Sequence, residues 1–266
     1  MRSSGWVLAG YLAAVAGVLL AAGLAAPPPA VQLWGGTPRF DAVAAHRQAG
    51  RLAEGFPYRP TGSPGAAAAA RWLEAEFRGL GLQAGTQRGG ALLGGRRVPL
   101  LNVYAVSPGR RRETVVVVAN FDMAPTSYQA ASDTAAGVGV LLELARVLSG
   151  EPHERTLLFV APDGEEWGML GARRFAFDPP VAGPFVASVV VEDLAIGRLL
   201  RLIPTMTGQF RGYTPMWLRE VARRAAQAEG VEFADPLWCS NMPTGPCSSL
   251  RPIRGHFSPP GSPLLN

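Results

Sequence analysis

The sequence predicts an α/β fold, a three-layer sandwich with a mostly parallel central sheet. Helical and strand patterns alternate along the chain, and the strand patterns are short apolar runs. The run TVVVVA at 114–119 is typical of a strand that is buried on both faces. Strands that alternate with helices in this way indicate a largely parallel sheet. About 230 residues follow the N-terminal segment, which suits one domain with a sizeable core.

The expected elements follow one another in a regular order. Helices are predicted where the spacing of apolar side chains places them on one side of a helix, as for Phe40, Val43, Ala44 and Leu52 in the first of them. Strands are predicted where apolar and β-branched residues run without interruption. The predicted helices are 40–54, 66–82, 135–148 and 215–229, and the predicted strands are 98–106, 114–119, 156–161 and 186–191.

The N-terminal segment predicts one transmembrane helix. Residues 6–26 carry no charge, and 21 helical residues span about 30 Å, the thickness of the hydrocarbon core of a bilayer. Arg2 precedes this segment and the next arginine is Arg39, so the domain is expected on the extracytoplasmic side of the membrane. The alternative is a cleaved signal segment ending in AAGLAA, which predicts a secreted protein. A Pro/Gly-rich linker at 27–39 leads to the domain, expected at 40–266.

The charge of the chain does not indicate a nucleic-acid partner. The net charge is +5, and all 25 basic residues are arginine, which together with abundant Ala, Gly and Pro is typical of GC-rich coding. The basic segment GRRRE at 109–113 is expected to be a solvated turn, because binding of nucleic-acid phosphates needs a wider basic stripe.

Cys239 and Cys247 could form a disulfide in an oxidising compartment, and their spacing matches no zinc motif.

Acidic side chains follow the predicted strands at the points where the strands end. Ligand sites of open α/β sheets gather at the carboxyl ends of the strands. Carboxylates that converge there repel one another unless a cation neutralises them. The pattern therefore predicts a metal site. Its candidate residues are Asp122, Asp133, Glu165, Glu166, Glu192 and Asp193.

Three of these acids also have a simpler interpretation. Asp133 precedes a predicted helix, where an aspartate commonly caps the backbone N–H groups of the first turn. Glu165 and Glu166 are adjacent, and adjacent acids are most often a solvated pair on a loop.

Four segments occur in a characteristic order: VVVVANFDMAP (115–125), ASDTAAGVGVLLELARVL (131–148), LLFVAPDGEEWGMLGARRF (157–175) and VVVEDLAIGR (189–198). Together they resemble the M28 family of zinc aminopeptidases. The loop RPTGSPG (59–65) is similar to an upstream element of that family.

The resemblance implies a zinc-aminopeptidase-like fold, one or two zinc ions and a role for each matched acid. Asp133 falls on the residue that bridges two zinc ions in the family, and Glu166 falls on a ligand of one of them. Glu165 falls on the general base that activates water. Asp193 falls on a further ligand, with Glu192 as the alternative because the local spacing differs by one residue.

Two features depart from the family pattern. Asn120 stands where the family has its first ligand histidine, and an amide oxygen is a weak zinc ligand. Asp122 is retained, although in the family its role is to orient that histidine. The family also closes its site with a histidine late in the chain. The only late histidine here is His256, in surroundings that do not match, and the sequence diverges from about residue 239.

The resemblance therefore implies zinc-dependent hydrolysis of N-terminal peptide bonds, with a peptide as substrate and the membrane as partner of the N-terminal helix. The departures at Asn120 and at the late histidine favour a first alternative, a catalytically inactive binding or scaffold protein of the same fold. A second alternative is an acyltransferase of the related glutaminyl-cyclase type, because DLAIG at 193–197 is slightly similar to a segment of those enzymes.

Overall fold

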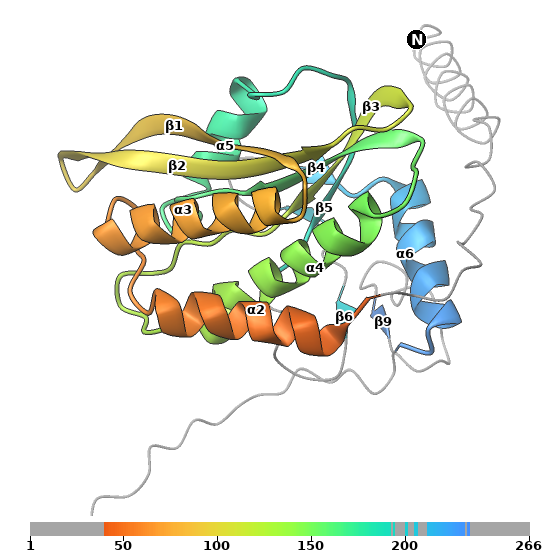
Figure 1. Ribbon diagram of the computed structural model, residues 1–266, viewed down its shortest axis with the longest axis horizontal. Coiled ribbons are helices and arrows are strands. Elements are labelled where there is room, and N and C mark those ends of the chain that lie inside the picture. Colours follow the sequence, from red (N-terminus) through yellow and green to blue (C-terminus); the bar gives the residue numbers. More distant parts are fainter. Residues whose placement is uncertain are drawn as a thin grey trace, which may run out of the picture. The chain divides into compact units, whose positions relative to one another are not determined.

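The computed structural model describes residues 40–192, 194, 200–201, 205–206, 212–231 and 233–234 (Figure 1). The chain divides into two compact units, Thr37–Gly197 and a second unit made of Met1–Gly36 and Arg198–Asn266. Within the described residues, no helix has the length and apolar character needed to cross a membrane. The predicted transmembrane helix at 6–26 and the linker at 27–39 lie outside these residues, as do Cys239, Cys247 and His256.

The unit Thr37–Gly197 is built on a five-stranded sheet in the order β1-β2-β4-β3-β5. β3 pairs in parallel with β4 and β5, whereas β2 pairs antiparallel with β1 and β4. The sheet is therefore mixed, and the expectation of a mostly parallel sheet holds only for β3, β4 and β5. The strands are β1 (Gln83–Leu93), β2 (Arg96–Ser107), β3 (Arg111–Val118), β4 (Arg155–Ala161) and β5 (Phe185–Val190).

The hairpin of β1 and β2 accounts for this difference. Gly94 and Gly95 join the two strands with φ angles of 54° and 77°. Two consecutive residues with positive φ form the type I′ turn, whose twist matches that of an antiparallel pair. β1 itself was not predicted, because QAGTQRGGALL contains three glycines and lacks a regular apolar pattern.

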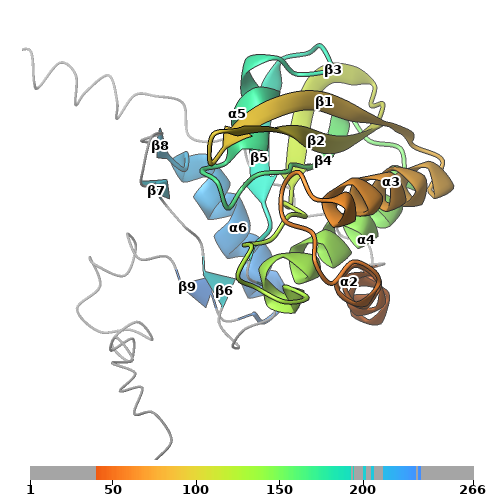
Figure 2. The ribbon, with the colours of Figure 1, turned by 90° about the vertical axis from the view of Figure 1, so that its left-hand side faces the viewer.

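Helices cover both faces of the sheet (Figures 1 and 2). α3 (Pro64–Gly79) packs on β1 and β2, α4 (Gly137–Ser149) packs on β4, and α2 (Ala42–Gly55) packs on α4. α5 (Leu170–Phe177) lies on the opposite face, against β1 and β2. The three larger helices confirm the predicted helices at 40–54, 66–82 and 135–148, whereas α5 was not predicted.

The larger core lies between the sheet and the layer of α2, α3 and α4. Leu52, Leu73, Phe77, Leu141 and Phe159 are fully buried there, and the rings of Phe77 and Phe159 stack with centroids 6.5 Å apart. A smaller cluster on the other face consists of Val116, Leu158, Val160 and Phe175. β3 and β4 are thus packed on both faces, which gives the loops after them a rigid base, whereas β5, which the sequence also predicted as a buried strand, is largely exposed.

α2 and α4 approach closely at Gly139. A Cβ atom at this position would lie 2.2 Å from the carbonyl oxygen of Ala45. Gly139→Ala is expected to push the helices apart and to lower the free energy of unfolding by about 1–3 kcal/mol, measured by urea denaturation. Gly79→Ala at the end of α3, where nothing lies within 4 Å of the added atom, is the control and should be neutral or stabilising. Equal effects of the two substitutions would contradict the close approach.

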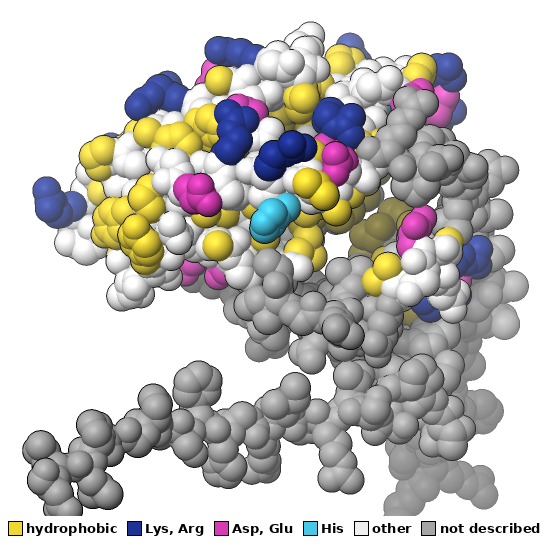
Figure 3. Space-filling model, turned by 60° about the horizontal axis from the view of Figure 1, so that its bottom comes forward, with side chains coloured by type: hydrophobic (Ala, Val, Ile, Leu, Met, Phe, Trp, Pro, Cys, Tyr) yellow, Lys and Arg dark blue, Asp and Glu magenta, His cyan; other side chains and the backbone are white. Residues whose placement is uncertain are grey.

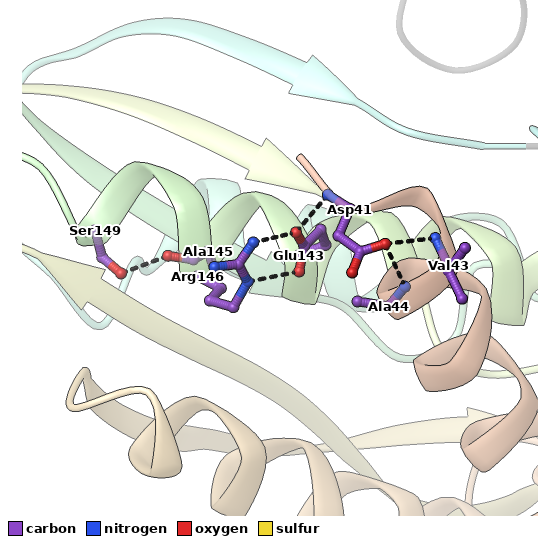
Figure 4. A network of polar contacts seen from close by, with 7 residues as sticks. All are labelled: Asp41, Val43, Ala44, Glu143, Ala145, Arg146 and Ser149. Carbon is purple, nitrogen blue, oxygen red and sulfur yellow. Dashed lines mark hydrogen bonds and ion pairs between the residues drawn. The ribbon is translucent and has the colours of Figure 1, made fainter. Parts of the chain in front are cut away.

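A buried carboxylate links α4 to the start of α2 (Figure 4). Glu143 accepts a hydrogen bond of 2.7 Å from the backbone N–H of Asp41. Both of its oxygens also accept from the Arg146 guanidinium, at 2.8 Å and 2.5 Å. Asp41 in turn caps α2 by accepting from the backbone N–H groups of Val43 and Ala44. The hydrogen bonds from Arg146, above all, hold the pKa of Glu143 below its ordinary value of 4.5.

The stabilisation by Glu143 should depend on pH. Because its pKa is lower in the folded than in the unfolded chain, the stabilisation is present above about pH 4.5 and is lost as the pH falls through the folded pKa. Glu143→Gln should lower the free energy of unfolding by about 1–2 kcal/mol at pH 7 and weaken its fall below pH 4.5. Urea denaturation over a pH series measures both effects. Glu154→Gln breaks an exposed pair with Arg110 and should change stability by only about 0.5 kcal/mol; an equal loss there would contradict the prediction.

Charges of both signs are interspersed on the surface. The face that Figure 3 shows carries separate Arg and acidic side chains among apolar ones. The predicted turn at 109–113 is confirmed only in part, because β3 already begins at Arg111. Arg110, in the turn, and Arg111, at the start of β3, lie 2.7 Å and 3.7 Å from the carboxylate of Glu154.

The second unit contributes one described helix, α6 (Met216–Ala228), which confirms the helix predicted at 215–229. Its short strands pair as β6 (Leu200–Arg201) with β9 (Phe233–Ala234), and as β7 (Thr205–Met206) with β8 (Gly212–Tyr213).

Candidate active site

Of the predicted acidic residues, the described ones lie on loops after β3, β4 and β5, with Asp133 on the turn before α4. These strands are parallel, so their carboxyl ends meet at one edge of the sheet. The backbone N–H of Glu165, after β4, donates a hydrogen bond of 3.2 Å to the Asp122 carboxylate after β3. The charges of Glu192 and Asp133 also act on Glu165. Loops distant in sequence therefore form one acidic edge.

Asp122 is the buried centre of this edge. Its Oδ1 accepts hydrogen bonds from the Glu165 backbone N–H at 3.2 Å and from the Asn120 amide at 3.4 Å. Its Oδ2 accepts from the Thr61 hydroxyl at 3.2 Å, and its backbone carbonyl accepts from the Thr134 hydroxyl at 2.9 Å. Burial raises the pKa of Asp122 above its ordinary value. Asp122 thus joins four segments of the chain, and the amide of Asn120 is one of its partners.

Glu165 is half-buried and surrounded by negative charge. Burial, followed by the charges of Glu192, Glu166, Asp122 and Asp133, raises its pKa to about 7. A carboxylate with a pKa near the working pH can both take up and release a proton at neutral pH. This is the property that a general base requires.

Asp133 and Glu166 lie close enough to influence each other. Burial first, and then the charges of Asp133 and Asp122, raise the pKa of Glu166. Asp133 is exposed on the turn Ala131–Ala136, with φ −110° and ψ 95°, and its peptide bond to Thr134 is cis. α4 begins only at Gly137, after an N-cap residue that is alanine, so Asp133 does not hold the cap position suggested as its simpler interpretation.

The negative charge of the carboxylates would attract a cation, but the described side chains form no complete metal site, and the residue at position 120 does not resemble a zinc ligand. Like charges at Glu165, Glu166 and Asp133 raise one another's energy, and a bound cation relieves such repulsion. The Asn120 side chain is buried and donates its amide N–H to Asp122. Within the described part of the chain, no three His, Cys, Asp or Glu side chains stand near enough to hold one ion. Asp193, the predicted further ligand, lies outside that part, whereas Glu192 is exposed at the end of β5.

The family of the protein follows from its sequence. The model of peptidase family M28 matches residues 102–236, which is half of the 266-residue chain. The chain belongs to peptidase family M28. The matched region contains every acidic residue of the candidate site.

Individual M28-like relatives match over shorter stretches. The alkaline phosphatase isozyme conversion protein of Escherichia coli (strain K12) is 31% identical over 150 residues, covering 48% of this chain and 44% of that protein. Aminopeptidase YwaD of Bacillus subtilis (strain 168) is 38% identical over 63 residues, covering 24% and 14%. The solved glutaminyl cyclase of Porphyromonas gingivalis is 26% identical with a TM-score of 0.55, over 61% of this chain and 63% of that one. This M28 chain thus spans less than half the length of the two curated relatives.

Three buried polar residues at the candidate site were not singled out from the sequence. Arg59 and Thr61 lie in a loop rich in Pro and Gly, and Asp163 lies beside a turn, where polar residues are normally solvated. Asp163 is fully buried instead: its Oδ2 accepts from the backbone N–H of Leu101 at 3.0 Å. Burial raises its pKa to about 6. The resemblance of RPTGSPG to a family element was the available signal for the first two.

Proposed function

We propose that this protein is a metal-dependent hydrolase that cleaves N-terminal peptide bonds, with Glu165 as its general base. One observation carries the proposal: Glu165 is half-buried beside Glu166, Asp133 and Asp122, and has a pKa raised to about 7. Membership of family M28 and the similarity to an aminopeptidase support a peptide as the substrate.

Asp133 and Glu166 are the described residues that would hold zinc, and Asp193 is proposed as a further ligand. The ion, as one or two zinc ions, would polarise the peptide carbonyl and lower the pKa of a bound water. Glu165 accepts the proton of the attacking water at its carboxylate. The hydrogen bond from its backbone N–H to Asp122 holds the loop of Glu165 against the end of β3. The segment 6–26 supports the further proposal of a membrane anchor that leaves this site on the extracytoplasmic side.

Two other functions have support from a specific observation. Asn120 occupies the place of a ligand histidine and gives its amide to Asp122, which supports a catalytically inactive binding protein. The 26% identity to a glutaminyl cyclase supports an acyltransferase that forms pyroglutamate from an N-terminal glutamine.

The test uses the full chain, purified in detergent and dialysed against zinc. Metal analysis is expected to find bound zinc, and mass spectrometry to find removal of N-terminal residues from a mixture of peptides. Glu165→Gln should keep the zinc and lose the cleavage. Ammonia release from a peptide with N-terminal glutamine, without shortening of other peptides, would replace the hydrolase by the cyclase. If the protein binds no zinc and turns over no substrate, the catalytically inactive binding protein is the function that remains.

A further inference from the structure

Arg59 is a fully buried arginine in the loop between α2 and α3. Its guanidinium donates to four backbone carbonyls: those of Phe121 at 2.7 Å, Phe56 at 3.2 Å, Gln129 at 2.7 Å and Ala130 at 3.1 Å. Within the described residues it forms no ion pair, and its one side-chain partner is the hydroxyl of Thr134, at 3.5 Å. A buried guanidinium whose N–H groups donate to backbone carbonyls links the chain segments to which those carbonyls belong.

Two of these carbonyls belong to a backbone that is unfavourable without support. Gln129 and Ala130 have φ angles of 61° and 44°, the left-handed region that side chains with a Cβ atom seldom adopt. Both carbonyls point to Arg59. Such conformations persist only where surrounding contacts enforce them, and Arg59 provides those contacts.

The segments held by Arg59 are those that bear the acidic site. Phe121 lies between Asn120 and Asp122, and Ala130 lies three residues before Asp133. The Ala130 carbonyl also accepts from the backbone N–H groups of Thr134 and Ala135, at 2.9 Å and 3.0 Å. One guanidinium therefore fixes both the loop after β3 and the turn before α4.

The positive charge of Arg59 is favourable next to the acidic site. The negative charges of Asp122 and Asp133 act on the guanidinium, although burial outweighs them and lowers its pKa to about 10. Arg59 therefore remains charged at neutral pH. It also offsets part of the repulsion among the carboxylates.

We infer that Arg59 is the positioning residue of the acidic site: it enforces the left-handed turn at Gln129 and Ala130 and thereby places Asp133 beside Glu166. Lysine cannot take over this role, because an ammonium has three donors at one point, whereas the planar guanidinium reaches carbonyls on separate segments. The part of the inference that concerns metal binding rests on the proposed function, and the part that concerns the turn does not.

The test is hydrogen exchange of the full chain without metal, followed by mass spectrometry. In Arg59→Lys, the amides of 129–135 are expected to exchange at least about ten-fold faster than those of α3, relative to wild type. Gly139→Ala is the matched control, a destabilising change between α2 and α4, and should speed exchange without selecting 129–135. Uniform acceleration in Arg59→Lys would overturn the inference, because it would make Arg59 an ordinary core residue.

A rescue variant keeps the test decisive if Arg59→Lys folds poorly. Ala130→Gly removes the conformational penalty at φ 44°, so the double variant should regain folding and part of the protection at 129–135. No recovery of either would contradict the link between Arg59 and this turn.

Zinc titration by calorimetry then tests the positioning of the ligands. Arg59→Lys should bind zinc about 10- to 100-fold more weakly, as for other residues that orient ligands, and Gly139→Ala should bind it as wild type does. Unchanged affinity in Arg59→Lys would refute the metal part of the inference. If wild type binds no zinc, the proposed function fails, and the exchange result still decides the role of Arg59.

Discussion

Glu165→Gln is expected to remove catalysis and to stabilise the protein at the same time. Loss of the proposed general base is expected to lower kcat by about 10²–10⁴-fold. The pKa of Glu165 is about 7 in the folded protein and has an ordinary value of 4.5, so stability is lost as the pH rises between these values. Glutamine cannot ionise and avoids this loss. We expect a gain of about 1–2 kcal/mol at pH 8, below the full linkage value because the side chain is half-buried.

Urea denaturation at pH 4 and pH 8 in the presence of a chelator measures this gain, which should vanish at pH 4. Glu54→Gln, at an exposed position near the end of α2, is the control and should be neutral at both pH values. A variant that is less stable than wild type at pH 8 would show that Glu165 is held by favourable contacts. The proposed role of its neighbours in raising its pKa would then be wrong.

Gly171→Ala is expected to disrupt the loop that carries Glu165 and Glu166. A Cβ atom at Gly171 would lie 2.1 Å from the carbonyl oxygen of Asp163 and 2.2 Å from Oδ1 of Asn102. Those atoms form the base of the loop: Gly171 N–H donates to Asp163 at 2.8 Å, and the Asn102 amide donates to the Gly171 carbonyl at 2.9 Å.

To make room for the methyl group, Gly171 must move away from Asp163 and from Asn102 in β2. The hydrogen bonds between these residues are then lost, and buried polar groups remain without partners. The free energy of unfolding should fall by about 2–3 kcal/mol, measured by urea denaturation, and hydrolysis should fall with it as Glu165 moves. Gly89→Ala in β1 adds the same methyl group with no atom nearer than 3.9 Å, and should stay within about 0.5 kcal/mol of wild type. A Gly171→Ala protein as stable as that control would disprove the tight contact.

The larger helices and the central strands were predictable because their patterns are local. α2 and α3 alternate apolar and polar positions at the helical period, and the runs in β3 and β4 are too apolar to lie on a surface. β1 and α5 escaped prediction for the opposite reason. β1 is rich in Gly and polar residues, and α5 is only eight residues long, so neither shows a clear local pattern. They hold their conformation by pairing with β2 and by packing on it.

The sequence by itself determined which acids could form a site, because each follows a strand or precedes a helix at a predictable place. Asp122, Asp133, Glu165 and Glu166 were predicted in this way, and in the structure their charges act on one another. Only the tertiary structure decided that Arg59 and Asp163 belong to the same region. A buried polar residue has no local pattern: its partners are backbone groups of other segments, and these meet it only when the chain is folded.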